Sequence, residues 1–425
     1  MRLDGSAASW RRARLRIGHG VVLVMLLAGL LPLGQLGAPL STDVRSAARP
    51  APEAVIVEVA RGANPGAVAR ALGVAPTHVF TEVFQGFAGE LPVGAVKAAE
   101  GQRGVIRIWP DLPVRAEAQT VPTGVDRVDA DQNPLAAISK DGASINAVVA
   151  VLDSGITKHR ELNIKGGKAC VGRNYDDGDA HGTHVAGTIA AKDNSRGVVG
   201  IAPGARLWAV KVLDNSGGGS LSSAICGLDW VYGHRKTIDV VNRSIGGGAT
   251  TADQNPCGPT TTPLHNAICK VVSGGVTVVA AAGNGHGDAA TVVPATYDEV
   301  ITVSAFTDVD GKPGGKGVST CTNDSDDTFA SFSNYGPDVD IAAPGACIRS
   351  TWLSGKYRTL SGSSMATPHV TGAVALYIAK GAGSGTPDDV RTWLLEHASR
   401  PQNPPYGFTG DQGGDRESVL YLGSQ

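Results

Sequence analysis

Three short segments carry residue types that could act together in nucleophilic catalysis. Asp153 ends an apolar run, His181 opens the sequence His-Gly-Thr-His, and Ser364 lies within Gly-Ser-Ser-Met-Ala. A hydrolase with a serine nucleophile needs such a set, because an imidazole takes the hydroxyl proton while a carboxylate orients the imidazole and stabilises its cation. The residue types therefore predict a hydrolytic site, provided that the fold brings them together.

Each of these residues also has a simpler interpretation. Asp153 could cap a loop, Ser364 could be the N-cap of a helix, and His181 and His184 could bind a metal through their i, i+3 spacing. A metal site of the H-E-x-x-H type would need a carboxylate and a third ligand that this segment lacks. The local context therefore disfavours the metal site.

The elements around these residues predict a parallel sheet covered by helices on both faces. Short Val/Ile/Ala-rich strands alternate with helical segments, which favours this α/β arrangement. We expect strands at 147–152, 207–212, 240–242, 276–281 and 300–305, helices at 181–191, 222–232, 263–272 and 365–379, and a last helix capped by Thr386 with Pro387 in its first turn. Because the carboxyl ends of parallel strands meet at one edge, polar residues there can converge.

A smaller unit precedes this sheet. The pattern predicts strands at 55–59, 78–83, 87–91 and 105–109 and helices at 67–72 and 93–100. This order is that of a split βαβ α+β sandwich. The polar stretch 115–122 has no periodicity and predicts a linker at a domain boundary.

Composition excludes several classes of protein. The 425 residues are 42% hydrophobic and 18% charged, which is typical of globular domains and excludes long-range disorder. The net charge of -2 supplies no global positive field, so a nucleic-acid partner is disfavoured. The 57 glycines and 5% aromatic residues argue against an all-helical fold.

The N-terminus predicts a signal peptide over residues 1–38. Basic residues from Arg11 to Arg16 precede an apolar run from Val21 to Leu31, which falls short of the roughly 20 residues that span a bilayer. We place cleavage between Gly37 and Ala48. The protein is therefore expected to be secreted, without a stable membrane anchor.

The even number of cysteines favours disulfides in an exported chain. None of the six has CxxC spacing, and six cysteines allow 15 connectivities. We predict pairing between neighbours along the chain, with free buried thiols as the alternative: Cys170–Cys226, Cys257–Cys269 and Cys321–Cys347.

Three segments together resemble the active-site blocks of the subtilisin-like serine proteases, most closely those of the proteinase K branch. These are residues 149–155 (VAVLDSG), 181–187 (HGTHVAG) and 362–369 (GSSMATPH). The resemblance extends from about Gln119 to Gln425. It implies that Asp153 orients the base, that His181 is the general base and that Ser364 is the nucleophile, whereas His184 and His369 would be structural.

The same resemblance nominates the groups that would bind the substrate. The segment Ala280 to Asn284 is similar to the family's oxyanion block, which implies that the Asn284 amide and the Ser364 backbone N–H stabilise the tetrahedral intermediate. Two further segments are similar to the edges that hold the substrate backbone as a third strand: Gly217, Gly218 and Gly219, and Ser244, Ile245 and Gly246. Arg243 departs from the pattern, because a small or apolar residue is more typical there.

The resemblance implies no cofactor for the chemistry but a structural calcium ion. Asp340, with the backbone carbonyls of Asp298 and Val300, occupies the place of one family calcium site. A second candidate is the run Asp308-Val309-Asp310-Gly311, and solvated acidic loops are the alternative for both. The insertion 312–327 has no function that we can assign.

The expected protein is a secreted serine endopeptidase of subtilisin-like α/β fold, made as a self-processing zymogen. Residues 50–117 resemble the inhibitory prodomain of the family, a small α+β ferredoxin-like unit, and 118–425 would be the catalytic domain, cut free near residues 116–120. We expect a monomer that acts on protein or peptide substrates and is inhibited by its own prodomain. A non-catalytic binding protein would lack part of the triad, and an α/β-hydrolase esterase would have G-x-S-x-G and the order Ser, Asp, His.

Overall fold

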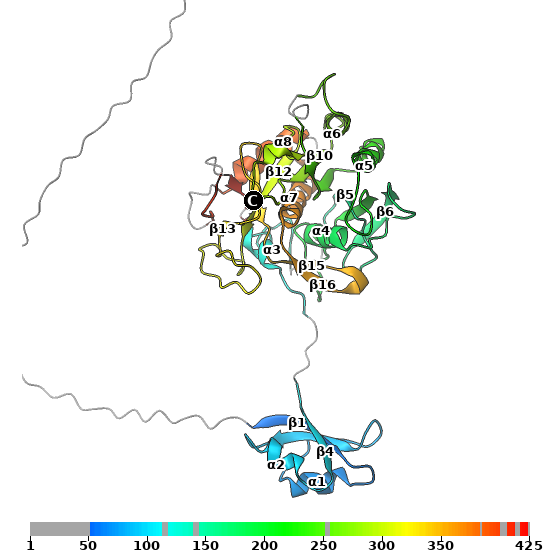
Figure 1. Ribbon diagram of the computed structural model, residues 1–425, viewed down its shortest axis with the longest axis vertical. Coiled ribbons are helices and arrows are strands. Elements are labelled where there is room, and N and C mark those ends of the chain that lie inside the picture. The colour runs from blue at the N-terminus through cyan, green and yellow to red at the C-terminus, as the bar shows by residue number, and fades with distance from the viewer. Residues whose placement is uncertain are drawn as a thin grey trace, which may run out of the picture. The chain divides into compact units, whose positions relative to one another are not determined.

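The structure is a computed structural model that describes residues 52–112, 118–138, 144–250, 256–382, 385–399, 406–412 and 417–423. The predicted signal peptide lies outside these residues. The chain divides into two compact units, residues 1–114 and 115–425 (Figure 1).

The first unit is a four-stranded antiparallel sheet with two helices. Its elements are β1 (Glu53–Val59), α1 (Pro65–Ala71), β2 (His78–Phe80), β3 (Gly86–Leu91), α2 (Val96–Glu100) and β4 (Val105–Pro110), with the strands in the order β2-β3-β1-β4. Val55, Val57 and Val59 alternate inward from β1 and are almost fully buried. The element order agrees with the predicted ferredoxin-like unit, although β2 ends three residues earlier than expected.

The second unit is built on a large sheet whose main strands run parallel. These are β5 (Val148–Asp153), β6 (Asn163–Ala169), β7 (Arg206–Lys211), β8 (Val240–Arg243), β10 (Thr277–Ala281), β12 (Ile301–Thr307), β14 (Ile341–Pro344) and β17 (Ser418–Val419). They lie in the order β17-β14-β12-β10-β8-β5-β7-β6, and only β13 (Thr328–Phe329) is antiparallel, beside β12. The predicted parallel sheet is confirmed, with β6, β14 and β17 as strands that the sequence analysis did not find.

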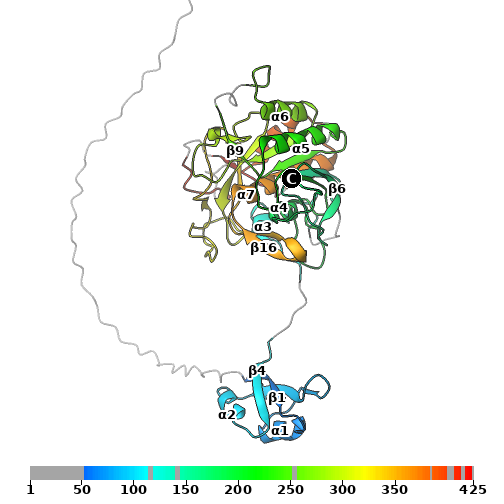
Figure 2. The ribbon, with the colours of Figure 1, turned by 45° about the vertical axis from the view of Figure 1, so that its right-hand side comes forward.

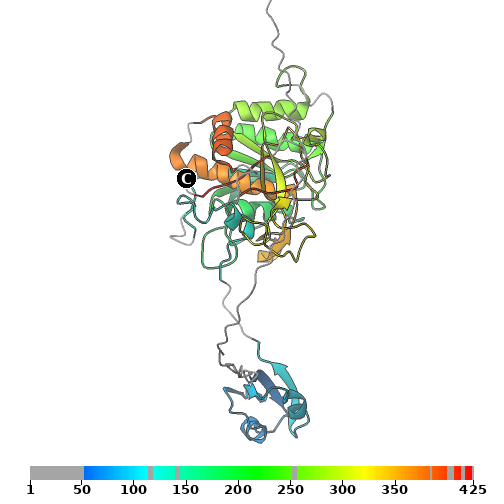
Figure 3. The same cartoon turned by 90° about the vertical axis from the view of Figure 1, so that its left-hand side faces the viewer.

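Helices cover both faces of this sheet. They are α3 (Thr123–Arg127), α4 (His181–Ala190), α5 (Leu221–Gly233), α6 (Pro263–Ser273), α7 (Ser363–Tyr377) and α8 (Pro387–His397). Because side chains alternate along a strand, Val149 and Val151 of β5 pack with α4 and α7, whereas Val148 and Leu152 pack with α5 and α6. Figure 2 shows α5 beside α6 and α4 beside α7. Helix α8, red-orange, lies beside the orange α7 in Figure 3; the predicted Thr386 cap is present, accepting a hydrogen bond from Asp389 N.

Two small antiparallel ribbons complete the second unit. Strands β9 (Gly247–Gly248) and β11 (Val292–Val293) form one, and β15 (Ile348–Thr351) and β16 (Tyr357–Leu360) form the other. The second ribbon contacts α4, the helix that begins at His181. Both ribbons therefore support segments that lead into the predicted site.

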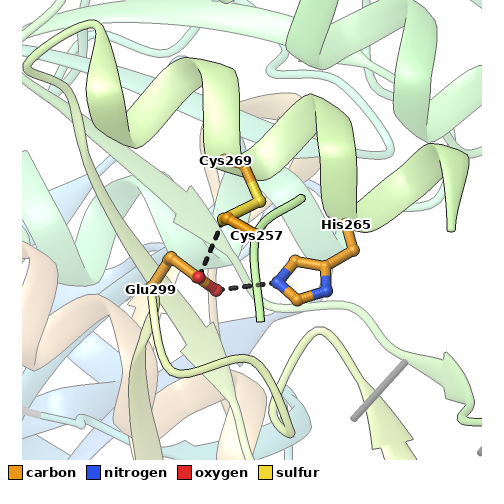
Figure 4. A group of neighbouring side chains, drawn as sticks. All are labelled: Cys257, His265, Cys269 and Glu299. Carbon is orange, nitrogen blue, oxygen red and sulfur yellow. Dashed lines mark hydrogen bonds and ion pairs between the residues drawn. A yellow bond between two sulfur atoms is a disulfide. The ribbon is translucent and has the colours of Figure 1, made fainter. Parts of the chain in front are cut away.

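The three predicted disulfides are confirmed: Cys170–Cys226, Cys257–Cys269 and Cys321–Cys347. The second joins the segment before α6 to that helix (Figure 4). His265 and Glu299 lie beside it, with His265 Nε2 2.7 Å from Glu299 Oε2. Because the sulfurs are bonded to each other, they cannot act as thiolate ligands, and we assign no metal to this cluster.

The loop from Asp308 to Asp327, which contains the predicted insertion, is held by its own carboxylates. Asp327 pairs with the buried guanidinium of Arg127 at 2.8 Å and accepts hydrogen bonds from Gly314 N and Gly315 N. Burial raises the pKa of Asp308 to about 8, despite the Arg127 charge. The carboxylates of Asp308, Asp310 and Asp326 gather within 4.8 Å, but Asp308 and Asp326 accept backbone N–H groups, and we assign no cation here.

None of the helices among the described residues is both long and apolar enough to cross a bilayer.

Candidate active site

The candidate site lies where the strand order of the large sheet reverses. Strand β5 is flanked by β7 on one side and β8 on the other. After β5 the chain forms β6 and β7 on the first side and then crosses to β8 on the second. Crevices form outside the carboxyl ends of strands at such switch points. Asp153 is the last residue of β5, so the topology puts this carboxylate at the crevice.

Asp153 and His181 meet directly. His181 Nδ1 lies 2.8 Å from Asp153 Oδ1, and the backbone N–H of Ser154 donates to the same oxygen at 2.7 Å. Asp153 is fully buried, whereas 26% of the His181 side chain is exposed. With Nδ1–H donating to the carboxylate, Nε2 of the neutral ring is free to accept a proton.

The electrostatics of the site favour the charged form of His181. Burial alone would lower the pKa of the imidazole, but the neighbouring carboxylates of Asp153, Asp179 and Asp177 outweigh it and raise the pKa to about 8. A base with a pKa in this range can take and return a proton near neutral pH.

Asp177, which the sequence analysis missed, positions the start of α4. Its carboxylate accepts hydrogen bonds from Ala180 N at 2.9 Å, from Thr183 N at 2.9 Å and from the Thr183 hydroxyl at 2.6 Å. It also accepts the Ser154 hydroxyl, which in turn accepts the N–H of Gly182. Asp177 therefore caps the helix that carries His181 and ties it to the segment after Asp153.

Gly182 has a steric reason to be glycine. A Cβ there would lie 2.2 Å from the carbonyl oxygen of Gly155. The close approach of these two segments, which carry His181 and Asp153, thus requires glycine at this point.

Ser364 lies at the start of α7 and contacts Ser244, one of the residues that line the neighbouring cleft. Its Oγ donates to the backbone carbonyl of Ser244 at 2.9 Å, and the Ser244 hydroxyl donates back to the Ser364 carbonyl at 2.8 Å. Ser244 and His181 line the same cleft. Among the described residues no hydrogen bond joins Ser364 Oγ to His181, a bond that in free enzymes is often long and tightens on substrate binding.

Asn284 is held with its amide N–H₂ available. Its Oδ1 accepts the Ser363 N–H at 2.8 Å and the Ser363 hydroxyl at 2.9 Å, so the oxygen is taken and Nδ2 is the donor left. A Cβ built on Gly362 would lie 3.5 Å from Asn284 Nδ2 and 3.7 Å from Ser364 N. The two predicted oxyanion donors therefore lie around the same point.

The predicted substrate-binding segments line a cleft of about 610 Å³. Its walls include Gly217, Gly219, Ser244, Ile245 and Gly246, together with His181, whereas Gly218 is not among its lining residues. The loop of the first segment is closed by Asp214, whose carboxylate accepts the N–H groups of Ser216 and Gly218. The cleft thus lies between the two glycine-containing segments, as the resemblance implied.

His184 and His369 are buried and bound to the backbone. His184 Nε2 lies 3.0 Å from the Arg358 carbonyl, and His369 Nδ1 lies 2.8 Å from the Met365 carbonyl. Burial lowers the pKa of each ring to about 4, so both are neutral at pH 7. Their contacts agree with structural roles and leave no i, i+3 metal pair with His181.

The groups of the predicted calcium site all accept hydrogen bonds from one arginine of the chain. The oxygens converge as expected, but the Arg391 guanidinium lies between them, donating to the Asp298 carbonyl at 2.5 Å, to the Val300 carbonyl at 2.5 Å and to Asp340 Oδ2 at 2.9 Å. A guanidinium supplies the positive charge and the donors that these oxygens need. Arg391 lies 51 residues after Asp340, so no local pattern indicates the pairing.

Comparison with known proteins points to one family. The sequence profile of the subtilase family matches residues 144–417. The chain is 40% identical to Subtilisin E of Bacillus subtilis (strain 168) over 300 residues, which cover 69% of this chain and 70% of that protein. It is 42% identical to a subtilisin of Bacillus pumilus over 270 residues, 62% of this chain and 86% of that one.

A solved structure agrees with these sequence matches. The crystal structure of a cold adapted subtilisin-like serine proteinase superimposes with a TM-score of 0.54 and 31% identity, covering 71% of this chain and 98% of that one. The matched family profile falls within the second unit. The chain therefore belongs to the subtilase family and is a serine-type endopeptidase.

Proposed function

We propose that Asp153, His181 and Ser364 form the catalytic triad of this endopeptidase. The observation that carries the proposal is the 2.8 Å contact between the buried Asp153 and His181, at a cleft that Ser364 reaches through Ser244. Ser364 Oγ attacks the peptide carbonyl carbon while His181 Nε2 takes its proton and then gives it to the leaving amine. Water repeats the sequence on the acyl-enzyme, releasing the acid and Ser364. Members of the family need no cofactor for this chemistry.

The oxyanion of the tetrahedral intermediate would be met by Asn284 Nδ2 and the Ser364 N–H. Support comes from the Ser363 N–H, which holds Asn284 Oδ1 and thereby aims the amide N–H₂ outward. Donors fixed before the reaction stabilise charge that develops only in the transition state.

Replacement of the nucleophile tests this proposal. Ser364→Ala should lower kcat on a denatured protein substrate by roughly ten thousand-fold to a million-fold, because the serine supplies the attacking oxygen. Ser273→Ala, at an exposed position at the end of α6, is the matched control and should keep full activity. Residual activity of Ser364→Ala within tenfold of the parent would reject the assignment of Ser364 as the nucleophile.

We also propose that residues 50–117 are an inhibitory prodomain and 118–425 the catalytic domain of a secreted zymogen. The first unit has the predicted ferredoxin-like topology, and the disulfides fit an oxidising compartment. Within the second unit, Gln119 and Thr120 are held in place, since Gln119 Nε2 donates to Asp193 at 2.6 Å and Thr120 N to the Gly197 carbonyl at 2.7 Å. These contacts support a mature chain that begins near Gln119.

Assignment to the proteinase K-like branch remains our proposal, supported by the three motif blocks. A phylogenetic tree of catalytic domains tests it. Grouping with the subtilisins would reject the branch without affecting the family.

A further inference from the structure

A buried arginine lies in the substrate cleft. Arg243 is the last residue of β8, 3% of it is exposed, and it lines the cleft together with Ser244 and Ile245. Because side chains alternate along a strand, Arg243 shares a face with Val241, which packs with α5 and α6. Asn242 points to the opposite face and accepts a hydrogen bond from Thr371 of α7. The guanidinium therefore lies beneath the cleft, on the helix α5 side.

Two of the three guanidinium nitrogens lack a hydrogen-bond partner. Nε and Nη1 of Arg243 are buried and donate to no hydrogen-bond acceptor among the residues that the structure describes. Among the described residues no ion pair to Arg243 forms either, although the lining residues of the cleft include one carboxylate, that of Asp179. Asp179 instead accepts the backbone N–H of His181.

An unpaired buried cation is costly, so its presence calls for a partner. Burial lowers the pKa of Arg243 to about 10, which still leaves the group charged at neutral pH. Small residues above it, including Gly219, Ala224 and Gly246, leave the cleft open for a side chain to enter. A carboxylate of the substrate could supply the missing acceptor and the opposite charge, through a charge-assisted hydrogen bond to the guanidinium.

We propose that Arg243 is a specificity-determining residue that pairs with an aspartate or glutamate side chain of the bound peptide, at one defined position relative to the scissile bond. The inference rests on the proposed peptidase function and adds a substrate class to it. It also accounts for the departure of residue 243 from the family pattern, since an apolar residue there could not bind a carboxylate.

Matched peptide pairs test the substrate side. Peptides that differ only by Glu against Gln, placed in turn at each of the four positions before and after the cleaved bond, should show one position at which Glu raises kcat/KM at least roughly tenfold. The isosteric pair isolates charge from size. If all peptides are cut and no position prefers Glu, the inference fails while the peptidase function stands; if none is cut, the function itself is in doubt.

Variants of Arg243 test the enzyme side through the Glu/Gln ratio. Arg243→Met should bring the ratio at that position to about one or below, and Arg243→Lys should keep part of the preference. Arg173→Met, which removes an exposed arginine that does not line the cleft, is the control and should keep the wild-type ratio. An unchanged ratio in Arg243→Met would overturn the proposal. Should Arg243→Met not fold, Arg243→Lys and the wild-type peptide ratios still decide it.

Discussion

At the scale of single residues, the site depends on how one aspartate and one asparagine are held. Asp153 is fixed by Ser154 N and faces His181 with one oxygen, and Asn284 is fixed by Ser363. These supporting contacts set which atom of each side chain faces the reaction. The residue-scale predictions therefore concern protonation and transition-state charge.

The pH dependence of kcat/KM should follow His181. The base must be neutral to accept the serine proton, and the carboxylates around it raise its pKa to about 8 in the free enzyme. Activity should therefore fall about tenfold per pH unit well below pH 8 and level off above it. Asp153→Asn should shift this limb to lower pH while lowering kcat on the order of ten thousand-fold. If the acidic limb of the pH–rate profile stays at the same pH in Asp153→Asn, the pairing of Asp153 with His181 is contradicted.

Asn284→Ala should act on turnover. The amide donor meets charge that appears only in the transition state, so kcat should fall by roughly one hundred to a thousand-fold while KM changes little. Steady-state kinetics on a short peptide measures both constants. An effect confined to KM would argue against the oxyanion role.

At the scale of elements, single charged residues hold two parts of the second unit in place. One lies in the loop before α4 and the other in α8. Asp177 caps α4 with hydrogen bonds to two backbone N–H groups and the Thr183 hydroxyl, and Arg391 of α8 joins the ends of neighbouring strands through Asp298, Val300 and Asp340. Both can be removed without touching the proposed triad.

Asp177→Ala should lower the free energy of unfolding by about 2 kcal/mol or more, because it removes a helix cap and leaves buried hydroxyls unpaired. Denaturation of the protein on a Ser364→Ala background, which avoids self-digestion, gives the value. Asp176→Ala, an exposed neighbour, is the control and should stay within about 0.5 kcal/mol of the parent. Equal stability of the two variants would reject the capping role.

Arg391→Met should lower the free energy of unfolding by roughly 1–3 kcal/mol, since Asp340 and two carbonyls lose a charged donor. Because the Arg391 guanidinium already binds these oxygens, a chelator should not change the melting temperature of the wild type through this site. Thermal melts of both proteins with chelator and with added calcium make the comparison. If calcium raises the melting temperature of the wild type but not that of Asp340→Asn, the result would support the predicted calcium site.

The sequence predicted the parallel sheet, five of its strands and the disulfide pairing, but not which partners the charged side chains bind. The composition of a run such as 147–152 indicates a buried strand, and the motif around Ser364 indicates a nucleophile. Asp177 lies among other aspartates in one loop, Asp176 and Asp179, and only the folded geometry selects it as the cap. The role of Arg391 could not be predicted either, because its partners come from distant segments and no pattern in its own helix indicates that it binds them.

At the scale of the whole molecule, the prediction concerns the two units as parts of a zymogen. If residues 50–117 are an inhibitory prodomain, a bond near residues 116–120 is the first that the enzyme cuts. Wild-type secreted protein should begin near Gln119, whereas Ser364→Ala, made without other proteases, should keep both units in one chain. The separated first unit should inhibit the mature enzyme when added in trans, because an inhibitory prodomain competes with the substrate peptide for the cleft. A Ser364→Ala chain that still begins near Gln119 would rule out self-processing.

The most direct test of the triad is covalent labelling by a fluorophosphonate, followed by intact mass measurement and peptide mapping. The account predicts one adduct per mature molecule, on Ser364, formed more slowly as the pH falls below about 8 and much more slowly in His181→Ala. Unfolded protein, as the control, should not react. Labelling of any other serine in the folded enzyme, or labelling of Ser364 at equal rates with and without His181, would contradict the account.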